Sequence, residues 1–240
     1  MKRPDIVKRH DIVSAAEWVR ARKTLLAKEK ELTRARDALS QARRELPWER
    51  VDKSYVFDGP AGETTLSNLF AGRSQLLVYH FMFAPDWDAG CKSCSFWADN
   101  FNGIVSHLAQ RDITFVAISR APLEKLLTFK KRLGWSFPWF SSGRTDFNFD
   151  YRVSFEKDRN DGTYNYEPKS YGGNELPGMS VFYRDESGAI FHTYSTYGRG
   201  VEMMNTAYHY MDLVPKGRDE EGLPDPMAWL KYHDQYDASA

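Results

Sequence analysis

The sequence predicts an α/β domain built on a central sheet, and two observations in the middle of the chain lead to this fold class. Two nearly continuous apolar runs, 76–83 and 113–119, have the composition of strands that are buried on both faces. A helical pattern follows each run, at 95–110 and at 122–135. This β-α-β-α alternation indicates a pair of parallel strands joined by right-handed crossovers.

Shorter elements flank this unit on both sides. Before the first apolar run we expect, in chain order, strands at 55–57 and 64–65 around a Gly-Pro turn and a brief helix at 66–70. After the second helix we expect a β-hairpin of 181–183 and 190–194 about the turn 185–188, and then a closing helix at 201–214. The hairpin makes the expected sheet mixed, with helices flanking it.

The chain divides into three predicted parts. A helical extension occupies 1–47, the main domain occupies 48–214, and an extended or wrapping tail occupies 215–240. Within the main domain, 137–177 is rich in Gly, Ser, Asn, Asp and Tyr and shows no persistent period. Because this stretch is too long for an ordinary connection, we interpret it as an insertion before the hairpin that serves function or an interface.

The extension predicts one long helix at 14–46. Ser14 and Glu17 have the spacing of a capping box, and Pro47 marks the end. Apolar residues recur every seven positions, with alanines beside them, at Trp18, Leu25, Leu32, Leu39 and Leu46. Two interpretations stay open: this stripe packs along its own domain, or it forms the seam of a homodimer. Against a long two-stranded coil, other seam positions carry Arg22, Glu29, Arg36 and Arg43.

Composition excludes several classes of function. Thirty-three basic and 33 acidic residues give a formal net charge of zero, which argues against nucleic acid as a partner. No apolar run approaches the roughly 20 residues that span a membrane. The first 18 residues are charged and lack the apolar segment of a secretory signal, so we expect a cytoplasmic protein. A reducing compartment argues against a structural disulfide.

The chemistry of the sequence centres on its two cysteines, Cys91 and Cys94, which form a CxxC motif after the first buried strand. Cys91 falls at the expected start of a helix, where unpaired N–H groups and the adjacent Lys92 favour the thiolate. Cys94 lies about one helical turn further on, within reach of a mixed disulfide formed at Cys91. We therefore predict that Cys91 is the nucleophile and Cys94 the resolving thiol.

Two other uses of the pair carry less weight. A zinc site needs two further ligands, yet the chain has no third cysteine and its six histidines are scattered singly. The pair could also be two small apolar residues with idle thiols. We expect no metal and no other cofactor.

At this point the sequence resembles the thioredoxin-like superfamily, through its order of strand, CxxC, helix, strand, helix, insertion, hairpin and helix. The front segment "VFDGPAGETTLSNLFAGRSQLLVYHF" is similar to the opening of the peroxiredoxin and thiol-reductase branches. The match is closer to an uncharacterised bacterial family of thioredoxin-like fold, known only as a domain of unknown function. It is carried by "LLVYHFMFAPDWDAGCKSCSFWADNF", "ISRAPLEKLLTFKKRLGWSFPWFSS", "DFNFDY", "LPGMSVFYRDESGAIFHTYSTYGRG" and "MDLVPKGRDE". This resemblance implies a thioredoxin-like mixed sheet over nearly the whole chain and implies no substrate.

The sequence departs from the better-known branches at two places. Where the resemblance to thioredoxins implies a cis-proline facing the CxxC, this chain has Met179, and Pro177 lies two residues earlier. Where peroxiredoxins carry a threonine, three residues before the reactive cysteine, this chain has Asp88, and Pro85 is offset by one. A carboxylate there opposes thiolate formation and offers peroxide no hydroxyl. These departures weaken the prediction that the protein reduces other proteins as thioredoxins do, and the prediction that it acts as a peroxidase.

Several further residues are candidates for supporting roles around the cysteines. Asp86 and Asp88, with Trp87 between them, could transfer protons to the resolving thiol. The simpler interpretation is that they belong to a solvated loop. Arg120, at the end of the second apolar run, and Arg199 could bind an anionic group of a substrate.

The leading prediction is a thiol-disulfide oxidoreductase that acts on an unknown thiol or disulfide substrate. The alternative is a non-enzymatic binding or scaffold protein that has kept the fold and lost the chemistry. A thiol peroxidase ranks below both, and a homodimer is the expected partner arrangement.

Overall fold

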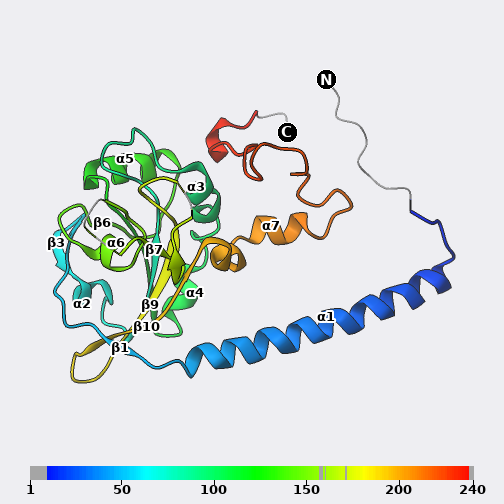
Figure 1. The fold of residues 1–240 in the computed structure, drawn as a ribbon, viewed down its shortest axis with the longest axis horizontal. Coiled ribbons are helices and arrows are strands. Elements are labelled where there is room, and N and C mark those ends of the chain that lie inside the picture. Colours follow the sequence, from blue (N-terminus) through cyan, green and yellow to red (C-terminus); the bar gives the residue numbers. More distant parts are fainter. Residues whose placement is uncertain (1–9, 157–158, 160, 171, 238–240) are drawn as a thin grey trace.

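A computed structural model describes residues 10–156, 159, 161–170 and 172–237. Its centre is one eight-stranded mixed sheet (Figure 1). In spatial order the strands are β1 (Glu49–Arg50), β10 (Ile190–Tyr197), β9 (Gly178–Arg184), β4 (Gln75–His80), β5 (Ile113–Ser119), β6 (Trp139–Ser141), β2 (Val56–Gly59) and β3 (Gly62–Thr65). Helices flank this sheet, as the sequence predicts, and β1 is a strand that the sequence analysis missed.

The pairing of the central strands confirms the thioredoxin-like fold. Strand β4 runs parallel to β5, and β5 runs parallel to β6. On its other side β4 pairs antiparallel with β9, which forms the predicted hairpin with β10. A parallel β-α-β pair that shares its first strand with an antiparallel hairpin is therefore the framework of the domain.

The helix expected at 95–110 is wrong as one element. The structure has two short helices, α3 (Lys92–Ala98) and α4 (Val105–Ala109), with a break around Phe101. The side-chain amides of the two flanking asparagines bond to backbone carbonyls, Asn100 to Phe96 and Asn102 to Gly134. Because such bonds compete with the helical ladder, the break lets Phe101 turn into the core, where it is fully buried.

The sheet separates two apolar layers, which follow from the alternation of side chains along β4. Tyr79 points into the layer that contains α3 and α5 (Leu123–Arg132). Leu76 and Val78 point into the other layer, which contains α2 (Leu66–Leu69) and α6 (Phe147–Asp150). Aromatic side chains dominate both layers, so most of the aromatic residues of the chain serve the core.

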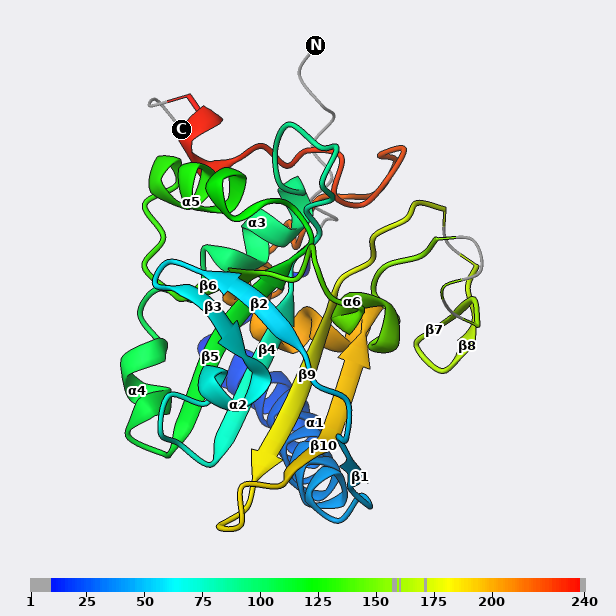
Figure 2. The same ribbon diagram turned by 90° about the vertical axis from the view of Figure 1, so that its left-hand side faces the viewer.

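The predicted insertion at 137–177 is only partly separate from the sheet. Its first residues form β6, a strand too short for its pattern to be visible in the sequence. The helix α6 follows, and then a small hairpin of β7 (Thr163–Tyr164) and β8 (Glu167–Pro168). Figure 2 shows this hairpin beyond α6 at the edge of the domain. Residues 157, 158, 160 and 171 of the insertion lie outside the described residues.

The closing helix expected at 201–214 is also divided. A 3-10 helix, η1 (Gly198–Met204), precedes α7 (Thr206–Met211). Asn205 separates them because its side chain accepts the backbone N–H of Tyr208 and caps α7. The tail then crosses the domain and ends in a 3-10 turn, η2 (His233–Gln235), and residues 238–240 lie outside the described part.

The long helix α1 (Ala15–Arg44) begins with the predicted capping box, in which Ser14 and Glu17 bond each other's backbone N–H. The expectation that its stripe packs on its own domain is wrong. None of its described residues is buried, and Figure 1 shows α1 leaving the domain as a straight arm. Trp48 holds the base of the arm against Tyr183 and Phe191 of the hairpin. Residues 1–9 of the predicted extension lie outside the described residues.

No helix within the described ranges combines the length and the apolar character needed to cross a membrane.

Candidate functional site

The two cysteines lie where β4 gives way to α3, and the backbone of Met82 contacts both. The carbonyl oxygen of Met82 accepts the N–H of Cys91 at 3.0 Å, and its N–H donates to the Cys94 sulfur at 3.4 Å. Cys91 is the residue before α3, and its carbonyl accepts the N–H of Ser95. Met82, two residues after the end of β4, thus fixes the backbone of Cys91 and the sulfur of Cys94 at the start of the helix.

The two thiols have opposite electrostatic environments. A hydrogen bond from the Cys94 thiol, assisted by the N–H groups of Ser93 and Cys94, lowers the pKa of Cys91 to about 7 despite partial burial. Burial raises the pKa of Cys94 well above its ordinary value. Cys91 is half-buried and Cys94 fully buried. At neutral pH a large share of Cys91 is therefore in the thiolate form, whereas Cys94 retains its proton.

A close approach of backbone and rings shapes the loop before Cys91. A Cβ atom on Gly90 would lie 2.7 Å from Phe81 and 2.9 Å from Phe129, so only glycine fits. The Gly90 carbonyl accepts the hydroxyl of Tyr232 from the tail at 2.6 Å. Lys125 of α5 donates to the carbonyls of Pro85 and Trp87, both at 2.9 Å. Contacts from two distant segments, α5 and the tail, hold this loop.

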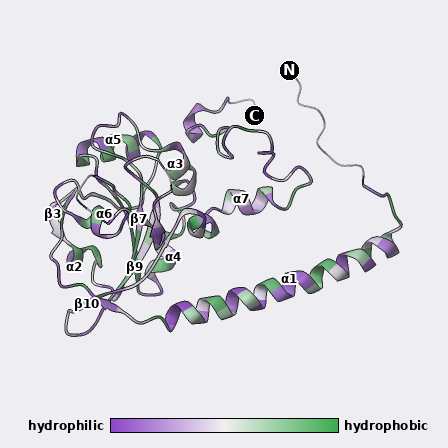
Figure 3. Ribbon diagram, in the orientation of Figure 1, coloured by the Kyte–Doolittle hydropathy of each residue, from purple (hydrophilic) through white to green (hydrophobic). Residues whose placement is uncertain are grey.

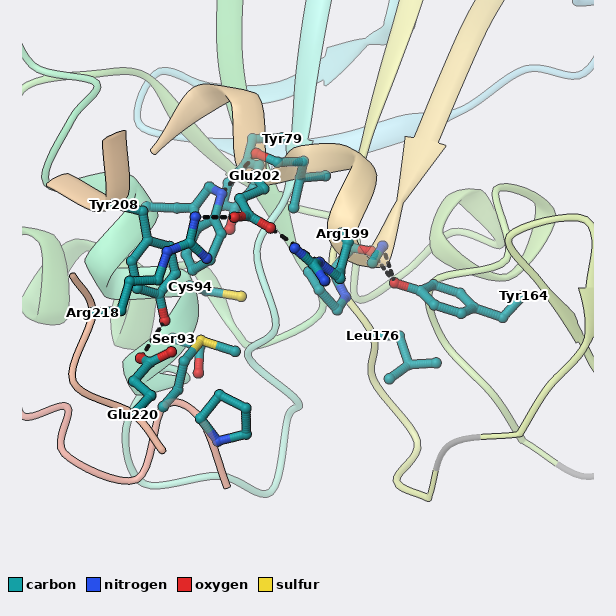
Figure 4. A pocket seen from close by; sticks show the side chains of 16 residues that line it. Tyr79, Ser93, Cys94, Tyr164, Leu176, Arg199, Glu202, Tyr208, Arg218 and Glu220 are labelled. Carbon is teal, nitrogen blue, oxygen red and sulfur yellow. Dashed lines mark hydrogen bonds and ion pairs between the residues drawn. The ribbon is translucent and has the colours of Figure 1, made fainter. Parts of the chain in front are cut away.

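A cavity of about 420 Å³ adjoins Cys94. Figure 4 shows the Cys94 sulfur turned toward the cavity, with Arg199 across from it. Most of the wall is apolar, and three further segments line it together with β4 and α3. The insertion supplies Tyr164, Leu176 and Pro177, η1 and α7 supply Val201 and Tyr208, and the tail supplies Met227. The insertion therefore forms part of the site, which the sequence analysis anticipated only from its position in the chain.

The charged residues of the cavity differ in how fully they are paired. Arg218 bonds both oxygens of Asp212, at 2.8 and 2.7 Å, contacts Glu202 and lies over the ring of Tyr208. Arg199 makes one ion pair, through Nε to Glu202 at 3.2 Å, and its side chain is 90% exposed. Among the described residues of the cavity wall, Arg199 is consequently the cation that keeps free donors at the mouth.

The predicted residues of the loop lie near the cysteines without lining the cavity. Asp86, Asp88 and Lys92 are exposed, and Trp87 is half-buried against the layer that contains Cys94. Of the cleft residues proposed from the sequence, the cavity is lined only by Cys94 and Arg199.

Arg120 and Met179, two candidates proposed from the sequence, take part in ion pairing and core packing and do not line the cavity. Arg120 pairs with the buried Glu175 at 3.0 Å and with Glu156 at 2.5 Å, and its guanidinium lies over Phe149. It thereby ties the insertion to the end of β5. Met179 is buried in β9 opposite Tyr79, whereas Pro177 lines the cavity.

The aromatic part of the site was not predicted from the sequence, above all Tyr79, which lines the cavity beside Cys94 and opposes the rise in the pKa of that thiol. The signal that could have found it is strand alternation. His80, the next residue, packs its ring against Phe147 and Tyr151 in the other layer, so Tyr79 must face α3 and its cysteine.

A second polar network, behind the sheet, was also missed. Hydrogen bonds link Glu49, His192, Ser195, Ser180 and His80 in that order, with the three bonds from His192 to His80 at 2.7 to 2.8 Å. The first three have the order of a hydrolase triad. Ser195, however, is buried, so the network pairs internal polar groups rather than facing a substrate.

The fold and the site define a thioredoxin-like protein with a CxxC pair at the junction of the central strand and its helix. The chain belongs to the bacterial protein family of unknown function DUF899, whose model matches residues 7–236. No curated protein matches the chain significantly.

Among solved structures, peroxiredoxins are similar in fold. Peroxidoxin BcpB from Mycobacterium tuberculosis is 12% identical, with a TM-score of 0.46, over 67% of this chain and 94% of that one. A structure of peroxiredoxin Q from Xanthomonas campestris is 14% identical, with a TM-score of 0.48, over 71% of this chain and 99% of that one. Such distant likenesses carry no argument about the reaction.

Proposed function

We propose that this protein is a thiol-disulfide oxidoreductase in which Cys91 attacks and Cys94 resolves. The observation that carries the proposal is the unequal pair of thiols. Cys91 is half-exposed with a pKa lowered to about 7, and Cys94 is buried with a raised pKa. Disulfide exchange needs one thiolate that substrate can reach and one thiol held in reserve beside it.

The reaction is balanced as a two-electron exchange. The Cys91 thiolate attacks a substrate disulfide, the sulfur–sulfur bond breaks, and one substrate thiolate leaves and takes a proton from water. Cys94 then loses its proton and attacks the Cys91 sulfur, which releases the second substrate thiol and leaves a Cys91–Cys94 disulfide. The substrate is reduced and the protein oxidised, and a dithiol reductant restores the pair.

The cavity beside Cys94 is the proposed place for the apolar part of the substrate. Its walls are aromatic and aliphatic, and Arg199 offers donors at the mouth for an anionic group. Replacing Leu176 by Trp fills the cavity without touching either cysteine. We expect this variant to raise the KM for an apolar disulfide, whereas Leu213→Trp on the exposed surface should leave it unchanged.

A redox titration tests the proposal directly. Equilibrated with mixtures of reduced and oxidised dithiothreitol, the protein should show a reversible two-electron couple, lost in Cys91→Ser and in Cys94→Ser. Cys94→Ser should in addition accumulate mixed disulfides at Cys91. A folded protein whose thiols remain reduced at every ratio would instead support the alternative, a thioredoxin-fold binding protein without redox chemistry.

A further inference from the structure

The arm α1 presents an apolar face that nothing in the described chain covers. Its leucine stripe consists of Trp18, Leu25, Leu32 and Leu39 and continues to Leu46 just after the helix, with exposed fractions of 59%, 52%, 60%, 51% and 44% in that order. Figure 3 shows apolar and polar residues alternating along the whole arm. Isolated helices with exposed leucines at such spacing gain stability mainly by packing against another helix.

The residues beside the stripe decide where the seam lies. Three positions after each of the first four members of the stripe stands the small row, Ala21, Lys28, Ala35 and Ala42. Four positions after stands the basic row, Arg22, Glu29, Arg36 and Arg43. Because the small row is mostly alanine, the seam runs between the leucine stripe and the small row. The basic row then flanks the seam, which removes the objection that its arginines would be buried inside a coil.

On the opposite flank, one position before each stripe residue, stands the acidic row, Glu17, Thr24, Glu31, Ala38 and Glu45. In a parallel two-stranded coil, each residue of this flank faces a residue of the other flank five positions later on the second helix. Glu31 therefore meets Arg36 of the partner subunit, and this is the pair on which the test below rests. Glu17 stands opposite Arg22 of the partner subunit, but within one chain Glu17 already caps Ser14 and Arg22 already pairs with Glu29 at 2.8 Å. The two remaining pairs, Thr24 with Glu29 and Ala38 with Arg43, bring no like charges together.

An antiparallel coil is disfavoured by the same rows. In that arrangement equivalent flanks face each other, so the glutamates of the acidic row lose their arginine partners, and the basic row, three of whose four members are arginines, faces itself. Charge complementarity thus selects one direction. Lys28, the single charged member of the small row, adds a position that favours one register.

We infer that α1 is half of a parallel, in-register, two-stranded coiled coil with a second copy of this chain. The inference is independent of the redox proposal. The 30 residues of α1 supply about four heptads, roughly 45 Å of seam. Because β1 and Trp48 anchor the C-terminal end of the arm to the sheet, both domains lie at the same end of the coil.

Sedimentation of charge variants of the full chain tests the direction of the coil. The wild type should sediment as a dimer of 27.8 kDa chains. Glu31→Arg and Arg36→Glu should each raise the dimer dissociation constant about tenfold, because each places like charges opposite one another twice per dimer. The double variant should restore dimerisation. Residues five apart do not face each other within one helix, so this rescue can only act between chains.

A control variant and a disulfide cross-link complete the test of the coiled coil. Arg34→Glu makes the same charge change as Arg36→Glu on the outer face and should leave the dimer intact. In a chain with both native cysteines changed to Ser, Ala42→Cys should form a disulfide with its own counterpart on mild oxidation. An antiparallel coil would hold these two sulfurs roughly 30 Å apart. A monomer at the highest concentration measured, or a dimer in which Ala42→Cys stays reduced, overturns the inference.

Discussion

The hydroxyl of Tyr232 donates a 2.6 Å hydrogen bond to the carbonyl oxygen of Gly90, which fixes the C-terminal tail to the residue before Cys91. The ring of Tyr232 packs on Phe129 at 5.4 Å and lies beneath the guanidinium of Arg132. Arg132 in turn bonds both oxygens of Asp234, at 2.7 and 3.0 Å. The tail is thereby held beside the nucleophile, and its release should change access to the sulfur.

Replacing Tyr232 by Ala should increase the rate at which iodoacetamide alkylates Cys91 at pH 7, by several-fold. The reason is that the variant loses the bond to Gly90 and the packing on Phe129 that keep the tail in place. Tyr210→Ala is the matched control, because Tyr210 is exposed. Equal rates for the wild type and both variants would show that the tail does not shield Cys91.

The alkylation rate of Cys91 should rise through neutral pH and level off above about pH 8. The lowered pKa of about 7 means that half of this thiol is ionised near pH 7. Because the hydrogen bond from Cys94 is the largest cause of the lowering, Cys94→Ala should move the midpoint to higher pH. Mass spectrometry of the labelled peptide at a series of pH values measures both midpoints, and a wild-type midpoint near that of a free thiol contradicts the assignment.

Much of the sheet could be predicted because its strands carry their own signals. The runs at 76–83 and 113–119 are apolar on both faces; β4 covers the first part of one, up to His80, and β5 covers all of the other. The breaks in the helices could not be predicted, because they depend on tertiary contacts such as the burial of Phe101 and the bond from Asn102 to Gly134. Strand β6 has three residues, too few for a period to emerge.

The candidate site likewise has a part that could be predicted from the sequence and a part that could not. Cys91 and Cys94 are found by local spacing, since both belong to one motif. The cavity wall could not be predicted, because Tyr164, Tyr208 and Met227 come from segments that only the folded chain brings together. Arg120 is a residue for which the sequence predicted a binding role that the structure does not support. Its position at a strand end indicated a ligand site, yet the buried carboxylate of Glu175 occupies it.

Replacing Glu175 by Gln should destabilise the protein by about 2 kcal/mol. Its side chain is 2% exposed and contacts both Arg120 and Ser154, so the neutral amide leaves a largely buried guanidinium with less compensation. Glu156, the other partner of Arg120, is 40% exposed, and Glu156→Gln should cost less than about 1 kcal/mol. Urea unfolding of the two variants measures the difference, and equal losses would contradict the assigned roles.

The last prediction concerns stability in acid and rests on His80. Burial lowers the pKa of His80 from 6.5 to about 3, and its Nε2 shares a 2.8 Å hydrogen bond with Ser180. Between these two pH values the unfolded chain binds a proton at this histidine and the folded chain does not. Its contribution to the free energy of unfolding is therefore complete above pH 6.5 and falls as the pH decreases, by at most about 1.4 kcal/mol per pH unit.

Chemical unfolding between pH 7 and pH 4 should accordingly show a shallower acid loss in His80→Gln than in the wild type, once each curve is referred to its own value at pH 7. The amide cannot take up the proton, so the difference between the two slopes isolates this one group. His107→Gln, at an exposed position, should keep the slope of the wild type. Parallel slopes for the wild type and His80→Gln would mean that His80 becomes protonated in the folded protein, which its burial and the unpartnered Nδ1 oppose.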